Sequence, residues 1–287
     1  MRADAQLESP FAPGSVHVGL DVGGRSVVVA REEIARYAAG TGARVEETDV
    51  APAFLYHSEV FRDVSWYLPN LIGNLHARQE WELFHPMRVG DALRSRVTVV
   101  ERYAKRGRLY VVAEVLWTDA EGRWLQRSRT HQSFLPEDQV PAGGVVVGRE
   151  RRPKRRFDTS GSGVEIHSFE RRITQEMCDA FSGPARNYHN DREKARELGF
   201  PEIVVQGMMP ICFVAEILTR RFGGGFLWAG KLDVRLVNVV WLGDVLAARA
   251  RIREIIPEGE RERALLDVWC EKEDGTVALI GQASAIV

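Results

Sequence analysis

The chain has 287 residues, 45% of them hydrophobic, and a formal net charge of −1 at pH 7. This balance excludes the strongly basic composition of many proteins that bind nucleic acids or anionic membranes. The sequence holds no run of eighteen apolar residues, and residues 1–15 lack the apolar centre of a signal peptide. We therefore expect a cytoplasmic protein with no membrane-spanning segment and no nucleic-acid partner.

The three cysteines are too widely spaced to form a metal-binding or redox pair. Each lies among apolar residues, at positions 178, 212 and 270. We expect all three to be buried thiols, which suits a reducing compartment.

The first half begins with an extended or disordered stretch, residues 1–15. One or two strands follow up to about residue 30, and then a helix that buries Ile34, Tyr37 and Ala38 and ends at the glycines at 40 and 42. Pro52 and Pro69 interrupt the next stretch, so that residues 43–75 allow only a short helix. Four alternating segments then predict strands up to residue 134, with turns at Gly90–Asp91 and at 119–122.

A linker rich in proline and glycine is predicted at residues 136–160. It contains a basic run at 149–156. Two interpretations stay open for this run: a solvated connector, or a landing site for the phosphates of a ligand.

The second half repeats the first. A strand and a helix ending in Ser-Gly at 182–183 repeat the elements that precede residue 42, and residues 241–287 repeat residues 88–134 almost element by element. A repeat of this length predicts two copies of one domain, at residues 16–135 and 161–287. Gly183 to Gly243 spans about ten residues more than Gly40 to Gly90, because the second copy has a long apolar helix at about 204–225 that the first has lost or shortened.

That helix is apolar on most of its faces, so it must be wrapped by other elements rather than laid on a surface. Its apolar positions are Val204, Met208, Ile211, Cys212, Val214, Ala215 and Ile217. A curved antiparallel sheet around one helix meets this demand and gives an α+β fold. At this point the sequence resembles the MaoC-like dehydratases, or (R)-specific enoyl-CoA hydratases, in their double hot-dog form. In several members of that form the N-terminal domain has an eroded central helix, so the resemblance implies a degenerate central helix in the first copy.

The most specific part of the resemblance lies at residues 181–191, FSGPARNYHND, followed by Gln206-Gly207-Met208. The family pattern is F-S-G-D-x-N-P-x-H-x-D and then His-Gly-Met. His189 matches the catalytic histidine, and Gly207 matches the glycine whose N–H polarises the thioester carbonyl. The sequence departs from the pattern at three places. Pro184 replaces the catalytic aspartate, Arg186 the asparagine, and Gln206 the histidine before the glycine.

The resemblance implies a hydro-lyase that hydrates enoyl thioesters, or dehydrates 3-hydroxyacyl thioesters, on CoA or acyl carrier protein. It implies no metal and no cofactor beyond the carrier, and a homodimer of double hot-dogs. His189 and Gly207 would be catalytic. The residues expected to bind substrate are Ser182, Gly183, Arg186, Asn187, Tyr188, Gln206 and Met208.

Several site residues have a second, structural interpretation. Asp191 either replaces the lost base or caps a short helix at 192–198, and the cap is favoured by the glycine past the helix end. Arg186 binds a substrate anion or forms a surface ion pair, and Tyr188 donates a hydrogen bond or anchors the core. Three polar residues of the first half also have two interpretations: they face the site, or they are loop residues without a catalytic role. They are His57, Glu59 and His76.

Two other functions compete with the hydro-lyase. The loss of the aspartate at 184 suggests a non-catalytic protein that binds acyl thioesters or serves as a partner subunit. A hot-dog thioesterase needs a carboxylate near the central helix, and Glu216 is the only one in the helix segment.

Overall fold

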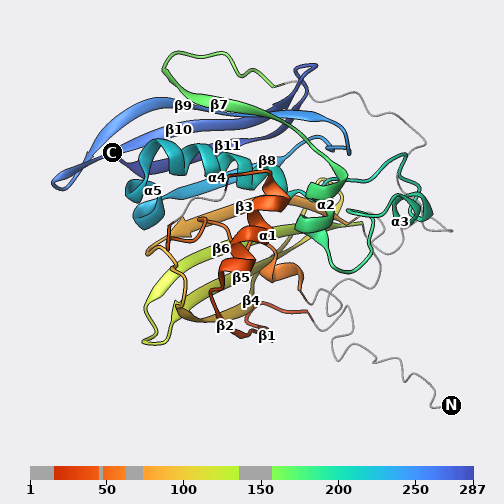
Figure 1. The fold of residues 1–287 in the computed structure, drawn as a ribbon, viewed down its shortest axis with the longest axis horizontal. Helices are drawn as coiled ribbons and strands as arrows, with labels where there is room; N and C mark the ends of the chain where they lie inside the picture. Colours follow the sequence, from red (N-terminus) through yellow and green to blue (C-terminus); the bar gives the residue numbers. More distant parts are fainter. Residues whose placement is uncertain (1–15, 45–47, 63–73, 136–156) are drawn as a thin grey trace.

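The computed structural model describes residues 16–44, 48–62, 74–135 and 157–287. Its strands form one antiparallel sheet in the order β1-β4-β5-β6-β3-β8-β11-β10-β9-β7, with β2 paired to β4 (Figure 1). Within the described residues, five α-helices and one short 3₁₀ helix accompany the sheet. The fold is the large antiparallel sheet with few helices that the double hot-dog prediction requires.

The first half supplies two short strands, one helix, a 3₁₀ turn and four long strands. Their bounds are β1 (Asp21–Gly23), β2 (Ser26–Val28), α1 (Arg31–Thr41), η2 (Glu59–Phe61), β3 (Leu75–Leu83), β4 (Ala92–Lys105), β5 (Arg108–Asp119) and β6 (Trp124–Phe134). Ile34, Tyr37 and Ala38 are buried on α1, as their spacing predicts. Gly42 ends the helix with a φ of 62°, whereas Gly40, predicted as a helix end, lies inside α1.

The second half supplies five strands and four helices. Their bounds are β7 (Val164–Arg172), α2 (Gln175–Ser182), α3 (Arg192–Glu197), α4 (Met208–Phe222), α5 (Gly224–Ala229), β8 (Lys231–Leu236), β9 (Val245–Glu258), β10 (Arg261–Lys272) and β11 (Val277–Ile286). The sequence predicts one long helix through residue 225. The structure breaks it at Gly223, whose φ of 51° favours glycine, and starts α5 there.

The strand order confirms the repeat. Strands β4, β5, β6 and β3 follow one another in the sheet as β9, β10, β11 and β8 do, and the two sets join where β3 pairs with β8. At this junction Trp81 lies opposite Leu232, and Arg78 makes two hydrogen bonds to Asp233, at 2.7 and 2.6 Å. The two copies therefore share one continuous sheet, in which β3 of the first half lies beside β8 of the second half.

Helix α4 is buried almost throughout, and it packs against β7, β9, β10 and β11. Its polar residues gather at the C-terminal end, where Glu216 pairs with Arg171 and Arg220. The wrapped central helix is thus confirmed for the second half. Val204, predicted within this helix, lies before it in an isolated bridge to Trp241.

Helices α1 and α2 pack against each other and so connect the two halves (Figure 1). A Cβ atom added to Gly40 would lie 3.0 Å from both Cα and Cβ of Phe181, so the two helices meet closely. Arg171 donates a hydrogen bond to the carbonyl oxygen of Thr41 at 2.6 Å. These contacts fix the end of α2, from which the loop at 183–191 begins.

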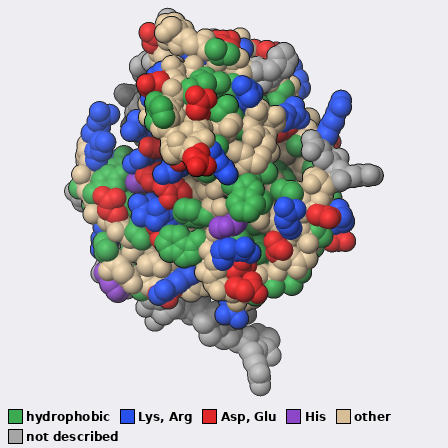
Figure 2. All heavy atoms as spheres, turned by 90° about the vertical axis from the view of Figure 1, so that its left-hand side faces the viewer, with side chains coloured by type: hydrophobic (Ala, Val, Ile, Leu, Met, Phe, Trp, Pro, Cys, Tyr) green, Lys and Arg blue, Asp and Glu red, His purple; other side chains and the backbone are tan. Residues whose placement is uncertain are grey.

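The opposite end of the molecule carries hydrophobic side chains among charges of both signs (Figure 2). Trp124 and Trp228 are 48% and 49% exposed. The three cysteines are free and buried, as predicted. Among the described residues no helix is long and apolar enough to cross a membrane.

Some predictions fall outside the described residues. These are the extended stretch at 1–15, most of the linker with its basic run, and part of the broken stretch at 43–75. The only helix within residues 48–62 is the 3₁₀ turn η2, so α4 has no long counterpart in that segment.

Candidate active site

A large open cleft of about 1880 Å³ lies between the two halves. Its wall is built by residues of the segment 55–62, the first residues of β3, the hairpin between β4 and β5, the end of α2, the loop before α4, and the end of β8. The site predicted from the sequence therefore opens toward elements of the first half.

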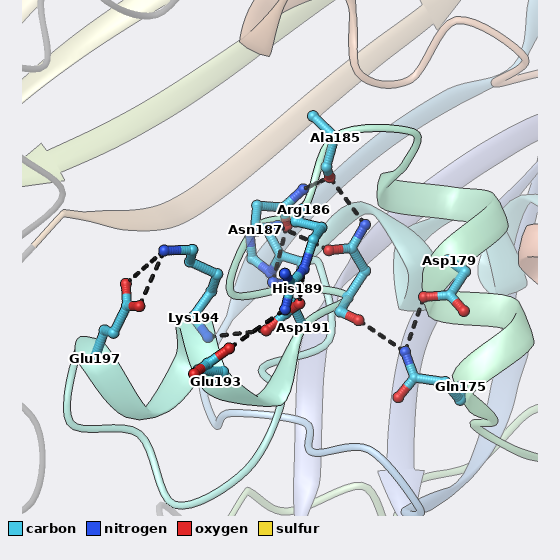
Figure 3. Close-up of polar contacts among 11 residues, drawn as sticks. Gln175, Asp179, Ala185, Arg186, Asn187, His189, Asp191, Glu193, Lys194 and Glu197 are labelled. Carbon is cyan, nitrogen blue, oxygen red and sulfur yellow. Dashed lines mark hydrogen bonds and ion pairs between the residues drawn. The ribbon is translucent and has the colours of Figure 1, made fainter.

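The loop after α2 is held by its own asparagines (Figure 3). Asn187 donates from its side chain to the carbonyl oxygens of Ser182 and Ala185, at 2.9 Å each. Its Oδ1 accepts the backbone N–H of His189 at 2.9 Å, and its backbone N–H donates to Asn190 Oδ1 at 2.8 Å. These bonds fix the backbone at His189, so Asn187 acts as a scaffold for the histidine.

His189 lines the cleft as a neutral imidazole, and one of its ring nitrogens is already hydrogen-bonded. Its Nδ1 lies 2.7 Å from the carbonyl oxygen of Val204, which accepts a hydrogen bond and so places the proton on Nδ1. Burial lowers the pKa of His189 to about 4, although the bond to Val204 acts in the opposite direction. Nε2 therefore keeps a free lone pair at neutral pH and can accept a proton.

Gly207 is the N-cap of α4, so its N–H is one of the helix-terminal donors that have no partner within the helix. A Cβ atom at this position would lie 3.2 Å from both Leu236 methyl groups and 3.3 Å from His76 Nδ1. Both neighbours also line the cleft. Glycine thus keeps open the space into which the N–H and the positive end of the helix dipole can point.

The place of the family aspartate offers no carboxylate. Pro184 follows a cis peptide bond from Gly183, is exposed, and is not part of the cleft wall. The described residues of the wall include two carboxylates, Glu33 and Glu59. Glu33 accepts a hydrogen bond from Tyr56 at 2.7 Å.

The carboxylate of Glu59 is also occupied by hydrogen bonds within the protein. Its side chain is 1% exposed and accepts bonds from Arg25 at 2.8 Å and from Ser95 at 2.7 Å. Glu59 therefore stabilises the first half and is not a free base.

His57 enters the site from the first half. Its ring stacks on Phe181 with ring centroids 4.0 Å apart, and its Nδ1 lies 2.6 Å from Ser58 Oγ. Burial, with a smaller contribution from the charge of Arg36, lowers its pKa to about 3.

Ser58 also contacts the second half, since its hydroxyl lies 3.4 Å from Gln206 Oε1. No periodic pattern in the sequence points to Ser58, although its neighbour His57 is among the candidates from the first half. Both residues line the cleft.

His76 is the second residue of strand β3 and lies beside Gly207. Its Nε2 lies 3.0 Å from Gln79 Oε1, which also accepts a bond from Thr130 at 2.8 Å. Burial lowers the pKa of His76 to about 4. Nε2 thus carries the proton, and Nδ1 is the unprotonated nitrogen near the start of α4.

The other residues predicted to bind substrate divide into two groups. Ser182, Gly183, Asn187, Tyr188 and Gln206 line the cleft. Met208 is buried in the core and is not in the wall. Arg186 is exposed and forms ion pairs with Asp191 and Glu193 outside the cleft, which corrects its assignment as a substrate ligand.

Asp191 is a helix cap, as the sequence favoured. Its side chain accepts the backbone N–H of Lys194 at 3.0 Å, at the start of α3. Its ion pair with Arg186, together with the cap, lowers its pKa. Asp191 is therefore not the replacement for the missing base.

Glu216 does not reach the cleft. It pairs with Arg171 at 2.9 Å and with Arg220, at the end of α4. A thioesterase that uses this carboxylate has no support from the geometry. Among the described residues no group of three or more potential metal ligands is placed to hold an ion.

Comparison with known proteins agrees with this architecture. Residues 168–264 match the family model of the MaoC like domain. A curated relative is the mitochondrial 3-hydroxyacyl-[acyl-carrier-protein] dehydratase FERN of Solanum lycopersicum, 28% identical over 103 residues. The match covers 36% of this chain and 61% of the relative, which is less than two thirds of its length.

Solved structures cover nearly the whole chain at low identity. A MaoC-like dehydratase superposes with a TM-score of 0.70 at 18% identity, covering 95% of this chain and 98% of the other. A MaoC-like dehydratase from Phytophthora capsici gives 0.66 at 18% identity over 94% and 96%. A Mycobacterium tuberculosis protein described as a double hot-dog gives 0.64 at 16% identity over 97% and 98%. Residues 168–264 therefore resemble a MaoC-like domain, and the chain has the double hot-dog fold of these solved structures.

Proposed function

We propose that the protein is a hydro-lyase for acyl thioesters, which adds water to an enoyl thioester or removes it from a 3-hydroxyacyl thioester. The observation that carries this proposal is the state of His189. Its Nδ1–H is anchored on Val204, its Nε2 is unprotonated, and it shares the cleft wall with Gly207 at the start of α4. A base and a carbonyl polariser are the two groups that this reaction needs.

In the hydration direction, His189 Nε2 accepts a proton from water while the water oxygen bonds to the β-carbon. The electrons of the double bond move toward the thioester oxygen, which the N–H of Gly207 stabilises. His189 then returns the proton to the α-carbon. One imidazole thus serves as base and acid in turn, and the atoms balance without a second ionised group.

Basic residues of the cleft wall suit a phosphorylated carrier. The hairpin between β4 and β5 brings Lys105, Arg106 and Arg108 to the wall, and Arg235 lies at the end of β8. These cations favour the phosphates of CoA or of the acyl-carrier prosthetic group. The carrier, the homodimer and the cytoplasmic location remain predictions.

A second function, a non-catalytic binder of acyl thioesters, is favoured by one observation: no uncommitted carboxylate accompanies His189 among the described wall residues. Turnover separates the two functions. Purified protein is incubated with short and long enoyl-CoA esters, and loss of the enoyl absorbance is followed. We expect turnover that falls about 10²- to 10⁴-fold in His189→Ala.

The control is His85→Ala, which removes a histidine that lies outside the cleft wall. We expect this variant to retain wild-type turnover. Binding of CoA esters without any turnover identifies the non-catalytic protein, and turnover unaffected by His189→Ala refutes the role of the histidine.

A further inference from the structure

The segment His57–Ser58 bridges the two elements that frame the proposed site. On one side the ring of His57 stacks on Phe181, the residue before the Ser182–Gly183 turn. On the other side the hydroxyl of Ser58 contacts Gln206, the residue before Gly207. A pair from the first half therefore lies between Phe181 at the end of α2 and Gln206 just before the start of α4.

The hydroxyl of Ser58 keeps a free acceptor site in every arrangement of its hydrogens. A hydroxyl has one hydrogen and two lone pairs. If Ser58 donates to His57 Nδ1, both lone pairs stay free. If His57 Nδ1–H donates to Ser58 and Ser58 donates to Gln206, one lone pair is used and one remains. Since Ser58 is in the cleft wall, this lone pair is available to a molecule in the cleft.

We propose that Ser58 takes the place of the missing carboxylate by orienting the reacting oxygen, with His57 and Gln206 holding the serine. The reacting oxygen is the water in hydration and the β-hydroxyl group in dehydration. This inference rests on the proposed hydro-lyase function, and it assigns to Ser58 a direct contact with substrate. His57 and Gln206 are positioning residues, because they act through Ser58.

The proposed step needs no ionised serine. The water donates one hydrogen to Ser58 Oγ and the other to His189 Nε2, which leaves a lone pair of its oxygen for the β-carbon. When the C–O bond forms, only the second hydrogen is transferred, and His189 later gives it to the α-carbon. Ser58 keeps its own proton throughout. The low basicity of the buried imidazole of His57 therefore does not obstruct the reaction.

Kinetics of three variants test the assignment. We expect Ser58→Ala to lower kcat about 10- to 10²-fold, with little change in KM for the enoyl thioester, because the acyl carrier is held elsewhere. His57→Phe keeps a ring against Phe181 but removes the nitrogen, and we expect a similar loss. Since both act through one oxygen, the double variant should be no slower than Ser58→Ala alone.

The matched control is Ser128→Ala, which deletes a buried serine hydroxyl of β6 outside the cleft wall. We expect wild-type kinetics for this variant. Losses that multiply in the double variant, or a Ser58→Ala enzyme with wild-type kcat, would overturn the proposal. A rise in KM alone would likewise overturn it, since that result assigns Ser58 to binding of the carrier.

A binding measurement makes the test independent of turnover. Calorimetry compares 3-hydroxybutyryl-CoA with butyryl-CoA on the His189→Ala background, which stops the reaction. We expect the hydroxylated ligand to bind about 5-fold more tightly, as one hydrogen bond allows, and this preference to vanish when Ser58→Ala is added. Equal binding of the two ligands before that substitution refutes the role of Ser58.

The two failures are distinguishable. If wild-type protein neither binds CoA esters nor turns them over, the hydro-lyase function itself fails, and the inference fails with it. If wild-type protein does both but Ser58→Ala changes neither kcat nor the ligand preference, only the inference fails.

Discussion

The burial of His57 predicts a measurable acid sensitivity of the fold. Its side chain is 8% exposed, its ring stacks on Phe181, and burial lowers its pKa to about 3. In the unfolded chain the pKa of a histidine is about 6.5. The unfolded state therefore binds a proton between pH 6.5 and 3 that the folded state does not, so the free energy of unfolding falls as the pH falls through this range.

The size of this loss depends on how far the pH lies below 6.5, the pKa of the unfolded histidine. At pH 5 the protonation of the unfolded histidine favours unfolding by about 1.5 × 1.36, or about 2 kcal/mol, relative to pH 8. His57→Phe removes this contribution and keeps an aromatic ring against Phe181. We expect the free energy of unfolding of the variant to fall by about 2 kcal/mol less than that of the wild type between pH 8 and pH 5.

Urea unfolding at pH 8, 6 and 5 measures this difference, with the slope of the transition as a check that the same surface is exposed. Both proteins keep the acid sensitivity that comes from His76 and His189, whose pKa values are also lowered, to about 4 each, so this contribution cancels in the comparison. If the free energies of unfolding of the variant and the wild type change in parallel with pH, the reasoning is refuted. His57 would then have the same pKa in the folded and the unfolded state.

Three further changes test the packing around the site. Gly40→Val places new methyl groups against Phe181, whose Cα lies 3.0 Å from a Cβ at position 40, and should lower the free energy of unfolding by about 2 kcal/mol in urea. Asp191→Ala removes the N-cap of α3 and should lower the free energy of unfolding by about 1 kcal/mol in the same assay. Asp191→Asn should retain most of the stability that the cap contributes. Arg171→Met leaves Glu216 with one exposed partner and should lower the thermal midpoint, with a cost of about 3 kcal/mol.

Much of the fold could be predicted because its signals are local. The alternation in residues 245–286 predicts strands directly, and the apolar run of α4 demands a surrounding sheet. The repeat extends this prediction to the first half, because the same order of elements in both halves predicts the same fold for both. The break at Gly223 was not foreseen, because apolar residues continue into α5 and the sequence alone does not reveal the positive φ.

The site was harder to predict because its partners are distant in sequence. Ser58 and Gln206 are separated by 148 residues, and no periodic pattern joins them. Arg186 was equally compatible with a ligand and a surface ion pair, and only the position of Glu193 and Asp191 decides for the ion pair. Local motifs placed His189 and Gly207, whereas the tertiary fold was needed to bring the first half to them.

The proposed reaction needs both halves of the chain. Residues 161–287 alone would retain His189 and Gly207 but would lose Ser58 and the strand that covers β8. Leu232 and Val234 on β8 are buried at 2% and 0% exposure, and β8 pairs with β3 over five residue pairs. Without β3 this strand becomes an open edge, which favours association over folding. The proposed reaction therefore combines His189 and Gly207 of one copy with Ser58 of the other copy in one covalent chain.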